Sequence, residues 1–162
     1  MGEKNNKTRL LRVLFRKYRV IRQTCDEQIL ERYRQEEEYY ESFEWFARLM
    51  EGKDPDRLIE DLQQTTDRTE RIIAHIERTV EEYGSEARQE DIKSWRGYDA
   101  LYSKYFSTSF STPKEISKKF GVKKSVIYKD LRHAETRLIT MLFEGSPSGE
   151  PSSEGENNKY CD

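Results

Sequence analysis

Apolar side chains recur every three or four residues through the first part of the chain, as they do along one face of an α-helix. The recurring positions are Leu11, Leu14, Tyr18, Ile21, Cys25, Ile29 and Tyr33, followed by Tyr39, Tyr40, Phe43, Phe46, Ala47 and Met50. No proline interrupts this stretch. The pattern therefore predicts one long helix over about residues 8–50.

A second stretch with helical spacing follows Gly52 and Pro55, residue types that commonly end one helix and begin the next. Its apolar and small positions are Leu58, Leu62, Thr65, Thr69, Ile72, Ile76, Val80 and Tyr83. They predict a helix over about residues 55–83, and the short connection favours an antiparallel arrangement of the two helices. Residues 1–90 are therefore expected to form a long, coiled-coil-like helical hairpin, or to pair with a second copy in a homodimer.

Gly84 and Ser85 predict the next break in the chain. Beyond it, large side chains fall three and four residues apart at Trp95, Tyr98, Leu101, Tyr102, Tyr105 and Phe106. This spacing predicts a helix over about residues 92–106. Aromatic stripes at helical spacing usually pack in a core, so we expect this face to be structural rather than to stack on a ligand.

The clearest helix start in the sequence lies at Thr112. Pro113 suits the first helical position, and Glu115 stands three residues after the threonine, which is the spacing of a capping box. The helix is expected to be only two turns long. Gly121 can then supply the positive φ that lets the chain leave the helix, and Val122 can fill the corner.

The longer segment after this turn carries one apolar stripe, at Ile127, Leu131, Ala134 and Leu138. A short helix, a glycine turn and a second helix held by a single stripe together favour a helix-turn-helix. The expected fold class is thus all-α: a helical hairpin over residues 1–90, a small helix-turn-helix domain over 91–144, and a tail over 145–162. The tail is rich in Gly, Ser, Pro and Glu and is expected to be disordered.

The opposite face of this second helix is basic and hydroxylated, which suits contact with DNA. Lysine and arginine neutralise phosphates and donate to guanine acceptors, while serine and tyrosine hydroxyls add hydrogen bonds. The candidate DNA-binding residues on this face and just before it are Lys123, Lys124, Ser125, Tyr128, Lys129 and Arg132. Lys118 and Lys119 of the short helix before the turn are candidates as well. The alternative interpretation is a solvated basic face with no ligand.

Charge is distributed unevenly, although the net charge is only −2. Residues 1–24 hold eight Lys or Arg against one acid, residues 25–111 hold 12 basic against 22 acidic side chains, and residues 112–139 hold eight against three. A basic segment joined to an acidic body is typical of polyanion binding by one part of a protein. The basic first helix could dock on DNA, on an acidic partner or on the acidic middle of the chain; we favour self-docking or dimerisation.

From Tyr98 onward the sequence resembles a known family. "YDALYSKYF" followed by "TPKEISKKFGVKKSVIYKDLRHAETRL" is similar to the fourth conserved region of bacterial sigma factors and to phage late-gene regulators of the ArpU and RinA type. The resemblance covers about residues 95–142 and implies that residues 123–132 enter the major groove of a promoter. Lys123 stands where that family usually has Ser or Thr. No segment resembles the part of sigma factors that melts promoters, which favours a regulator or a partial sigma-like factor.

Other chemistry is sparse in this sequence. Cys25 and Cys161 are far apart, and with His75 and His133 they form no metal-ligand pattern, so neither a disulfide nor a metal nor another cofactor is expected. No phosphate-binding glycine loop or nucleophile motif is present, and an enzyme is not expected. No long apolar run predicts a membrane segment, so we expect a cytoplasmic protein without membrane contact.

The sequence thus predicts a sequence-specific transcription regulator that binds promoter double-stranded DNA, with RNA polymerase as a further candidate partner. A phage or prophage origin with control of late genes is implied by the resemblance. The main alternative is a helical DNA-packaging or assembly adaptor, such as a small terminase-like subunit. Such adaptors usually carry the DNA-binding module first, whereas here it comes last. A purely protein-binding hairpin is a third possibility.

Overall fold

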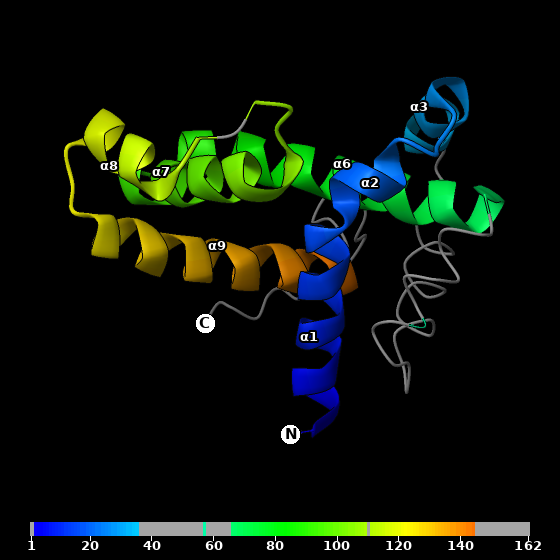
Figure 1. Ribbon diagram of the computed structural model, residues 1–162, viewed down its shortest axis with the longest axis horizontal. Helices are drawn as coiled ribbons and strands as arrows, with labels where there is room; N and C mark the ends of the chain where they lie inside the picture. Colours follow the sequence, from blue (N-terminus) through cyan, green and yellow to red (C-terminus); the bar gives the residue numbers. More distant parts are fainter. Residues whose placement is uncertain (1, 36–56, 58–65, 110, 145–162) are drawn as a thin grey trace, which may run out of the picture.

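The computed structural model describes residues 2–35, 57, 66–109 and 111–144 (Figure 1). In these ranges the chain is all-α, as predicted, with seven α-helices, one π-helical segment and no strand. The elements are α1 (Gly2–Arg16), α2 (Tyr18–Arg22), α3 (Glu27–Gln35), α6 (Thr66–Gln89), α7 (Ile92–Leu101), η1 (Tyr102–Phe106), α8 (Pro113–Phe120) and α9 (Lys124–Glu144).

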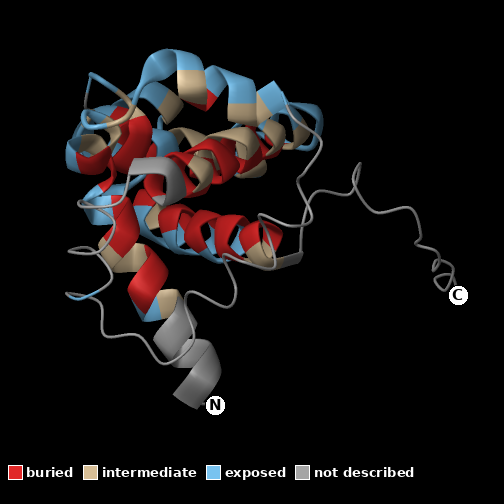
Figure 2. Cartoon of the chain, turned by 90° about the vertical axis from the view of Figure 1, so that its right-hand side faces the viewer, coloured by how far each residue is buried: buried red, intermediate tan, exposed pale blue. Residues whose placement is uncertain are grey.

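Helix α6 is the central element. It is buried on most of its sides, as its own small and apolar residues show: Ile72, Ile73, Ala74, Ile76, Val80 and Ala87 are all buried. Helix α3 packs along α6, α7 and α9 also pack on it, and α1 crosses the end of the bundle (Figure 1). In Figure 2 the buried residues gather on the facing sides of the helices. Buried side chains from all seven α-helices and η1 belong to one hydrophobic cluster.

The prediction of a single helix over residues 8–50 is wrong within the described residues, where the chain bends at Lys17 and again over 23–26. Local side-chain bonds cause the second break. Thr24 Oγ1 donates to the carbonyl of Ile21 at 2.8 Å, and Asp26 Oδ1 accepts the N–H of Gln28 at 2.9 Å at the start of α3. The remainder of the predicted helix, residues 36–50, lies outside the described residues.

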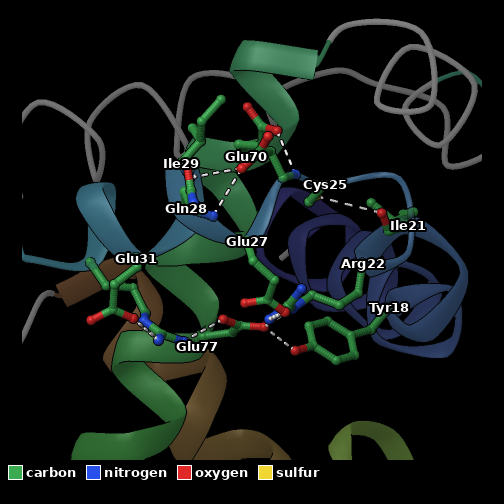
Figure 3. Close-up of polar contacts among 12 residues, drawn as sticks. Tyr18, Ile21, Arg22, Cys25, Glu27, Gln28, Ile29, Glu31, Glu70 and Glu77 are labelled. Atoms are coloured by element: carbon green, nitrogen blue, oxygen red, sulfur yellow. Dashed lines mark hydrogen bonds and ion pairs between the residues drawn. The ribbon is translucent and has the colours of Figure 1, made fainter.

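Glu77 of α6 holds these N-terminal helices in place (Figure 3). Its carboxylate accepts hydrogen bonds from the Tyr18 hydroxyl, from Arg22 Nε and from Arg34 Nη1. Burial, with the bond to Glu77, raises the pKa of the Tyr18 hydroxyl well above its ordinary value. One acidic side chain thereby ties α2 and α3 to α6.

Two further arginines connect the basic N-terminal segment to the rest of the chain. Arg12 Nε donates to Glu135 Oε1 of α9 at 3.1 Å. Arg19 donates to the carbonyls of Ser103, Lys104 and Ser107 at 3.2, 3.1 and 2.9 Å, which caps the end of η1. Part of the positive charge of this segment therefore already takes part in contacts within the chain.

The predicted break at Gly84 and Ser85 is also wrong, because α6 continues to Gln89. Gly84 instead allows a close helix contact: a Cβ at this position would lie 2.8 Å from Cζ of Tyr98 in α7. The actual break follows Gln89, and Asp91 caps α7 by accepting the N–H of Ser94 at 2.8 Å. The predicted start of this helix near Pro55 lies outside the described residues.

The helix predicted over residues 92–106 is confirmed as α7 and η1, which follow each other without a gap. Its aromatic face is partly buried, with Tyr105 and Phe106 in the core and Trp95 and Tyr98 packed against it. The division of the chain at residue 90 stays a prediction, and residues 145–162 lie outside the described residues.

Candidate nucleic-acid interface

The interface begins at the N-terminus of α8, where the predicted capping box is confirmed. The N–H of Glu115 donates to Thr112 Oγ1 at 3.2 Å, and the N–H of Thr112 donates to Glu115 Oε1 at 2.8 Å. Pro113 occupies the first turn, where its missing N–H costs nothing. These contacts fix the direction in which α8 leaves the loop before it.

The predicted turn at Gly121 is confirmed as well. Gly121 has φ 67° and ψ 36°, the left-handed region that favours glycine. Its N–H donates to the carbonyl of Lys118 at 3.3 Å, and the N–H of Val122 donates to that of Ser117 at 3.0 Å. The turn is thus closed by backbone bonds, and only three residues lie between the end of α8 and the start of α9.

Helix α9 is anchored by the predicted stripe, since Ile127, Leu131, Ala134 and Leu138 are all buried. Its backbone passes close to α7: a Cβ on Gly97 would lie 3.1 Å from the carbonyl oxygen of Asp130. The Asp130 side chain is buried and forms an ion pair with Arg96 of α7. Because one side of α9 packs closely against α7, the residues on its other side are held in fixed positions at the surface.

The side of α9 that faces solvent carries the predicted DNA-binding residues. Those on α9 and in the turn before it are all exposed: Lys123, Lys124, Ser125, Tyr128, Lys129 and Arg132. Tyr128 is the large apolar side chain of this group, and 47% of its surface is exposed. A tyrosine so exposed on a basic helix face can contact a ligand without any rearrangement of the core.

The two remaining predicted residues, Lys118 and Lys119, are exposed on α8. Lys119 Nζ lies 2.9 Å from Asp99 Oδ2 of α7, and its side chain is still 59% exposed. Among the predicted cations, and within the described part of the chain, Lys119 alone has a carboxylate partner. The others can neutralise phosphates without first losing an ion pair.

Two exposed residues beside this face were not predicted. Lys114 lies four residues before Lys118, one turn away on α8, and His133 follows Arg132 on α9. The four-residue spacing of Lys114 and Lys118 was a signal in the sequence that could have identified the first. Nothing in the sequence distinguished His133 from a packed histidine.

A separate feature is an open groove of about 900 Å³ lined by residues of α2, α3, α6, α7 and η1. One wall carries Trp95, Tyr98 and Tyr102, whose neighbouring rings stack with centroids 5.4 and 5.8 Å apart. Its lining also holds four arginines and four acidic residues, and Arg22 and Arg34 pair with Glu77 within it. The lining thus holds equal numbers of cationic and acidic side chains.

No metal-binding group of three or more ligands occurs among the described residues. None of the helices in the described ranges combines the length and the apolar character needed to cross a membrane. No family model matches the chain, and no curated protein or solved structure matches it either. The functional interpretation therefore rests on the geometry of α8 and α9.

Proposed function

We propose that this chain is a sequence-specific, DNA-binding transcription regulator whose α8 and α9 form a helix-turn-helix. One observation carries the proposal: α9 is fixed by a buried stripe on one side and presents exposed cations on the other, directly after a tight glycine turn. The major groove of DNA is about 12 Å wide and admits an α-helix. Helix α9 would enter it with its N-terminal half.

The roles of the exposed residues follow from their position along the two helices. Lys129 and Arg132 lie on α9 beyond its first turn and are assigned to base edges. Lys118 lies on the preceding helix and is assigned to a phosphate. Lys119 is a weaker phosphate contact, because a phosphate must compete with Asp99 for its ammonium group.

The resemblance to sigma-factor region 4 and to phage late-gene regulators adds the expectation of promoter DNA as the target. It also makes RNA polymerase a candidate partner. Residues 1–90 would then serve assembly, including homodimer formation, or polymerase contact. The described part of this segment, with Arg12 bonded to Glu135, supports a role in holding α9.

Salt titrations of matched variants test whether the face reads sequence. Arg132→Ala should weaken binding to a selected site by about 1 to 3 kcal/mol and change binding to random duplex little. Lys118→Ala should weaken binding to both DNAs and reduce the slope of log K against log salt by about 1. Equal losses for both variants on both DNAs would reduce the face to an electrostatic patch and contradict the proposal.

Mapping of bound DNA in the native host separates the regulator from the packaging adaptor. A regulator should occupy sites upstream of several promoters. A single occupied site beside packaging genes would favour the adaptor, and the absence of any enriched DNA would contradict both.

A further inference from the structure

One wall of the open groove is a row of aromatic rings along α7 and η1. Trp95 stacks on Tyr98, and Tyr98 stacks on Tyr102, with an interplanar angle of 25° in both pairs. Arg88 of α6 covers the end of the row at Trp95, with its guanidinium carbon 5.1 Å from the ring centroid. At the other end Phe106 lies 6.4 Å from Tyr102. The ring faces are therefore covered by neighbours, and the groove meets the ring edges.

A flat ligand cannot enter this row between the rings. To stack between two rings, a nucleobase needs about 7 Å between them, because carbon atoms in contact lie about 3.5 Å apart. The centroid separations of 5.4 and 5.8 Å leave no such space. The row is thus a ridged surface that a ligand touches from the side.

The polar atoms of the wall favour a ligand that is rich in hydrogen-bond acceptors. Within the described residues, the indole N–H of Trp95 and the hydroxyls of Tyr98 and Tyr102 have no hydrogen-bond partner, and solvent reaches all three. The indole is a donor only, and the edges of aromatic rings carry positive partial charge. Proline is the complementary residue, because its carbonyl accepts while it has no N–H to donate.

The length of the row fits an extended peptide. From Trp95 to Tyr102 the helical backbone rises about 10 Å. One three-residue turn of polyproline II is about 9 Å long, and its carbonyls form no bonds within the helix. A proline-rich segment that lies along the row can therefore place one carbonyl near each end of it.

The charge of the groove favours a cation in the ligand. Each of the four arginines in the lining already contacts a carboxylate, a backbone carbonyl or an aromatic ring. Among the four acids, Glu27, Glu77 and Asp99 form ion pairs. The fourth, Glu81, is exposed and has no ion pair or hydrogen bond with any residue that the structure describes. Glu81 is thus available to a basic side chain.

The register of α6 against α7 places Glu81 towards one end of the row. Arg88 lies over Trp95, and a Cβ on Gly84 would lie 2.8 Å from Cζ of Tyr98. Positions that decrease along α6 therefore meet positions that increase along α7. Glu81 comes three residues before Gly84 and lies on the side of Tyr102.

We propose that this groove binds an extended, proline-rich segment of a partner protein, with a basic residue beside the prolines. The pyrrolidine rings pack on the ridged wall, and two carbonyls accept hydrogen bonds from Trp95 and Tyr102. The basic residue pairs with Glu81. The lining includes no residue of α9, so this contact is independent of the DNA contact proposed above.

Calorimetric titration of the full-length chain with a terminally blocked oligoproline peptide that ends in arginine tests this site. Tyr102→Phe keeps the ring and removes the donor, and it should raise Kd about three- to tenfold, the effect of one hydrogen bond. Tyr128→Phe makes the same change at an exposed tyrosine of α9 and should leave Kd unchanged. Glu81→Gln should abolish the preference of the wild-type chain for the arginine peptide over one that ends in glutamate.

Three results would overturn the inference. The first is a wild-type chain that does not bind the arginine peptide at millimolar concentration, and the second is a Kd that Tyr102→Phe leaves unchanged. The third concerns the ligand: a peptide with glycines in place of the prolines should bind more weakly, because it is not preorganised, and equal affinity would contradict recognition of polyproline II. If single-stranded oligothymidylate binds instead and Tyr102→Phe weakens it, the groove is a nucleic-acid site and not a peptide site.

Discussion

The two histidines of the chain occupy opposite environments. His75 is buried in α6, and its Nε2 lies 3.1 Å from the carbonyl oxygen of Leu142. His133 is exposed on α9. Burial lowers the pKa of His75 to about 4, although the bond to Leu142 acts in the opposite direction. The folded chain therefore keeps His75 neutral at pH values where an unfolded histidine is charged.

This difference predicts a pH dependence of stability. Between the unfolded pKa near 6.5 and the folded value of about 4, the unfolded state binds the extra proton. The free energy of unfolding should therefore fall as the pH drops from 7 towards 4, by up to about 3 kcal/mol from this group. Denaturant titrations should show a shallower pH dependence for His75→Gln than for the wild type. His133→Gln is the matched control, and equal slopes for all three chains would contradict the prediction.

The candidate site residues were predictable from the sequence because each lies at a fixed number of residues from Gly121. Once the turn is placed, helical periodicity decides which side chains face out, and all eight predicted residues are exposed. The partner of Lys119 was not predictable in this way. Asp99 is twenty residues away in sequence, and only the packing of α7 beside α8 brings the two charges together.

At the scale of elements, the turn between α8 and α9 depends on one backbone conformation. A Cβ at Gly121 would meet no atom within 4 Å, so any cost of substitution comes from its φ of 67° and not from a clash. Gly121→Val should lower the free energy of unfolding by about 1 to 3 kcal/mol, because a β-branched residue is strained there. Gly121→Asn should cost less, since asparagine tolerates this region. Denaturant unfolding of the full-length chain measures both, and equal stability of the two variants would rule out the backbone explanation.

Elements with local signals were predicted well, and those set by distant contacts were not. The capping box at Thr112 and the stripe of α9 are local and were confirmed. Gly84 was misinterpreted as a helix stop because its reason, the approach of Tyr98, comes from another helix. The break before α3 had a local signal in Thr24 and Asp26, but the apolar spacing continues across it and masked that signal.

At the scale of the whole molecule, self-association through residues 1–90 remains a prediction. The described half of the expected stripe is already used within the chain, since Leu11, Leu14 and Ile21 are fully buried. These three side chains therefore cannot also form the interface of a homodimer. Light scattering of the full-length chain should show a dimer at micromolar concentration, and a monomer at all concentrations would contradict this prediction.

Because the helices share one core, we expect them to unfold cooperatively. Leu14 of α1 belongs to the same buried cluster as Ile127 and Leu138 of α9, so the N-terminal helices and the proposed DNA-binding helices should unfold together. Leu14→Ala should cost about 2 to 5 kcal/mol, the usual range for a fully buried leucine. The loss should be equally visible at Trp95 of α7, which packs against the cluster.

The measurement uses a Trp45→Phe background, so that fluorescence reports Trp95 alone, together with far-ultraviolet circular dichroism. Leu14→Ala should shift both transitions by the same amount. Val20→Ala is the control, because Val20 of α2 is 51% exposed and a surface truncation should change stability by no more than about 0.5 kcal/mol. If Trp95 keeps its wild-type transition while the dichroism shifts, the chain unfolds as two units. The basic N-terminal segment would then be independent of α9, because the bond between Arg12 and Glu135 would not couple their stabilities.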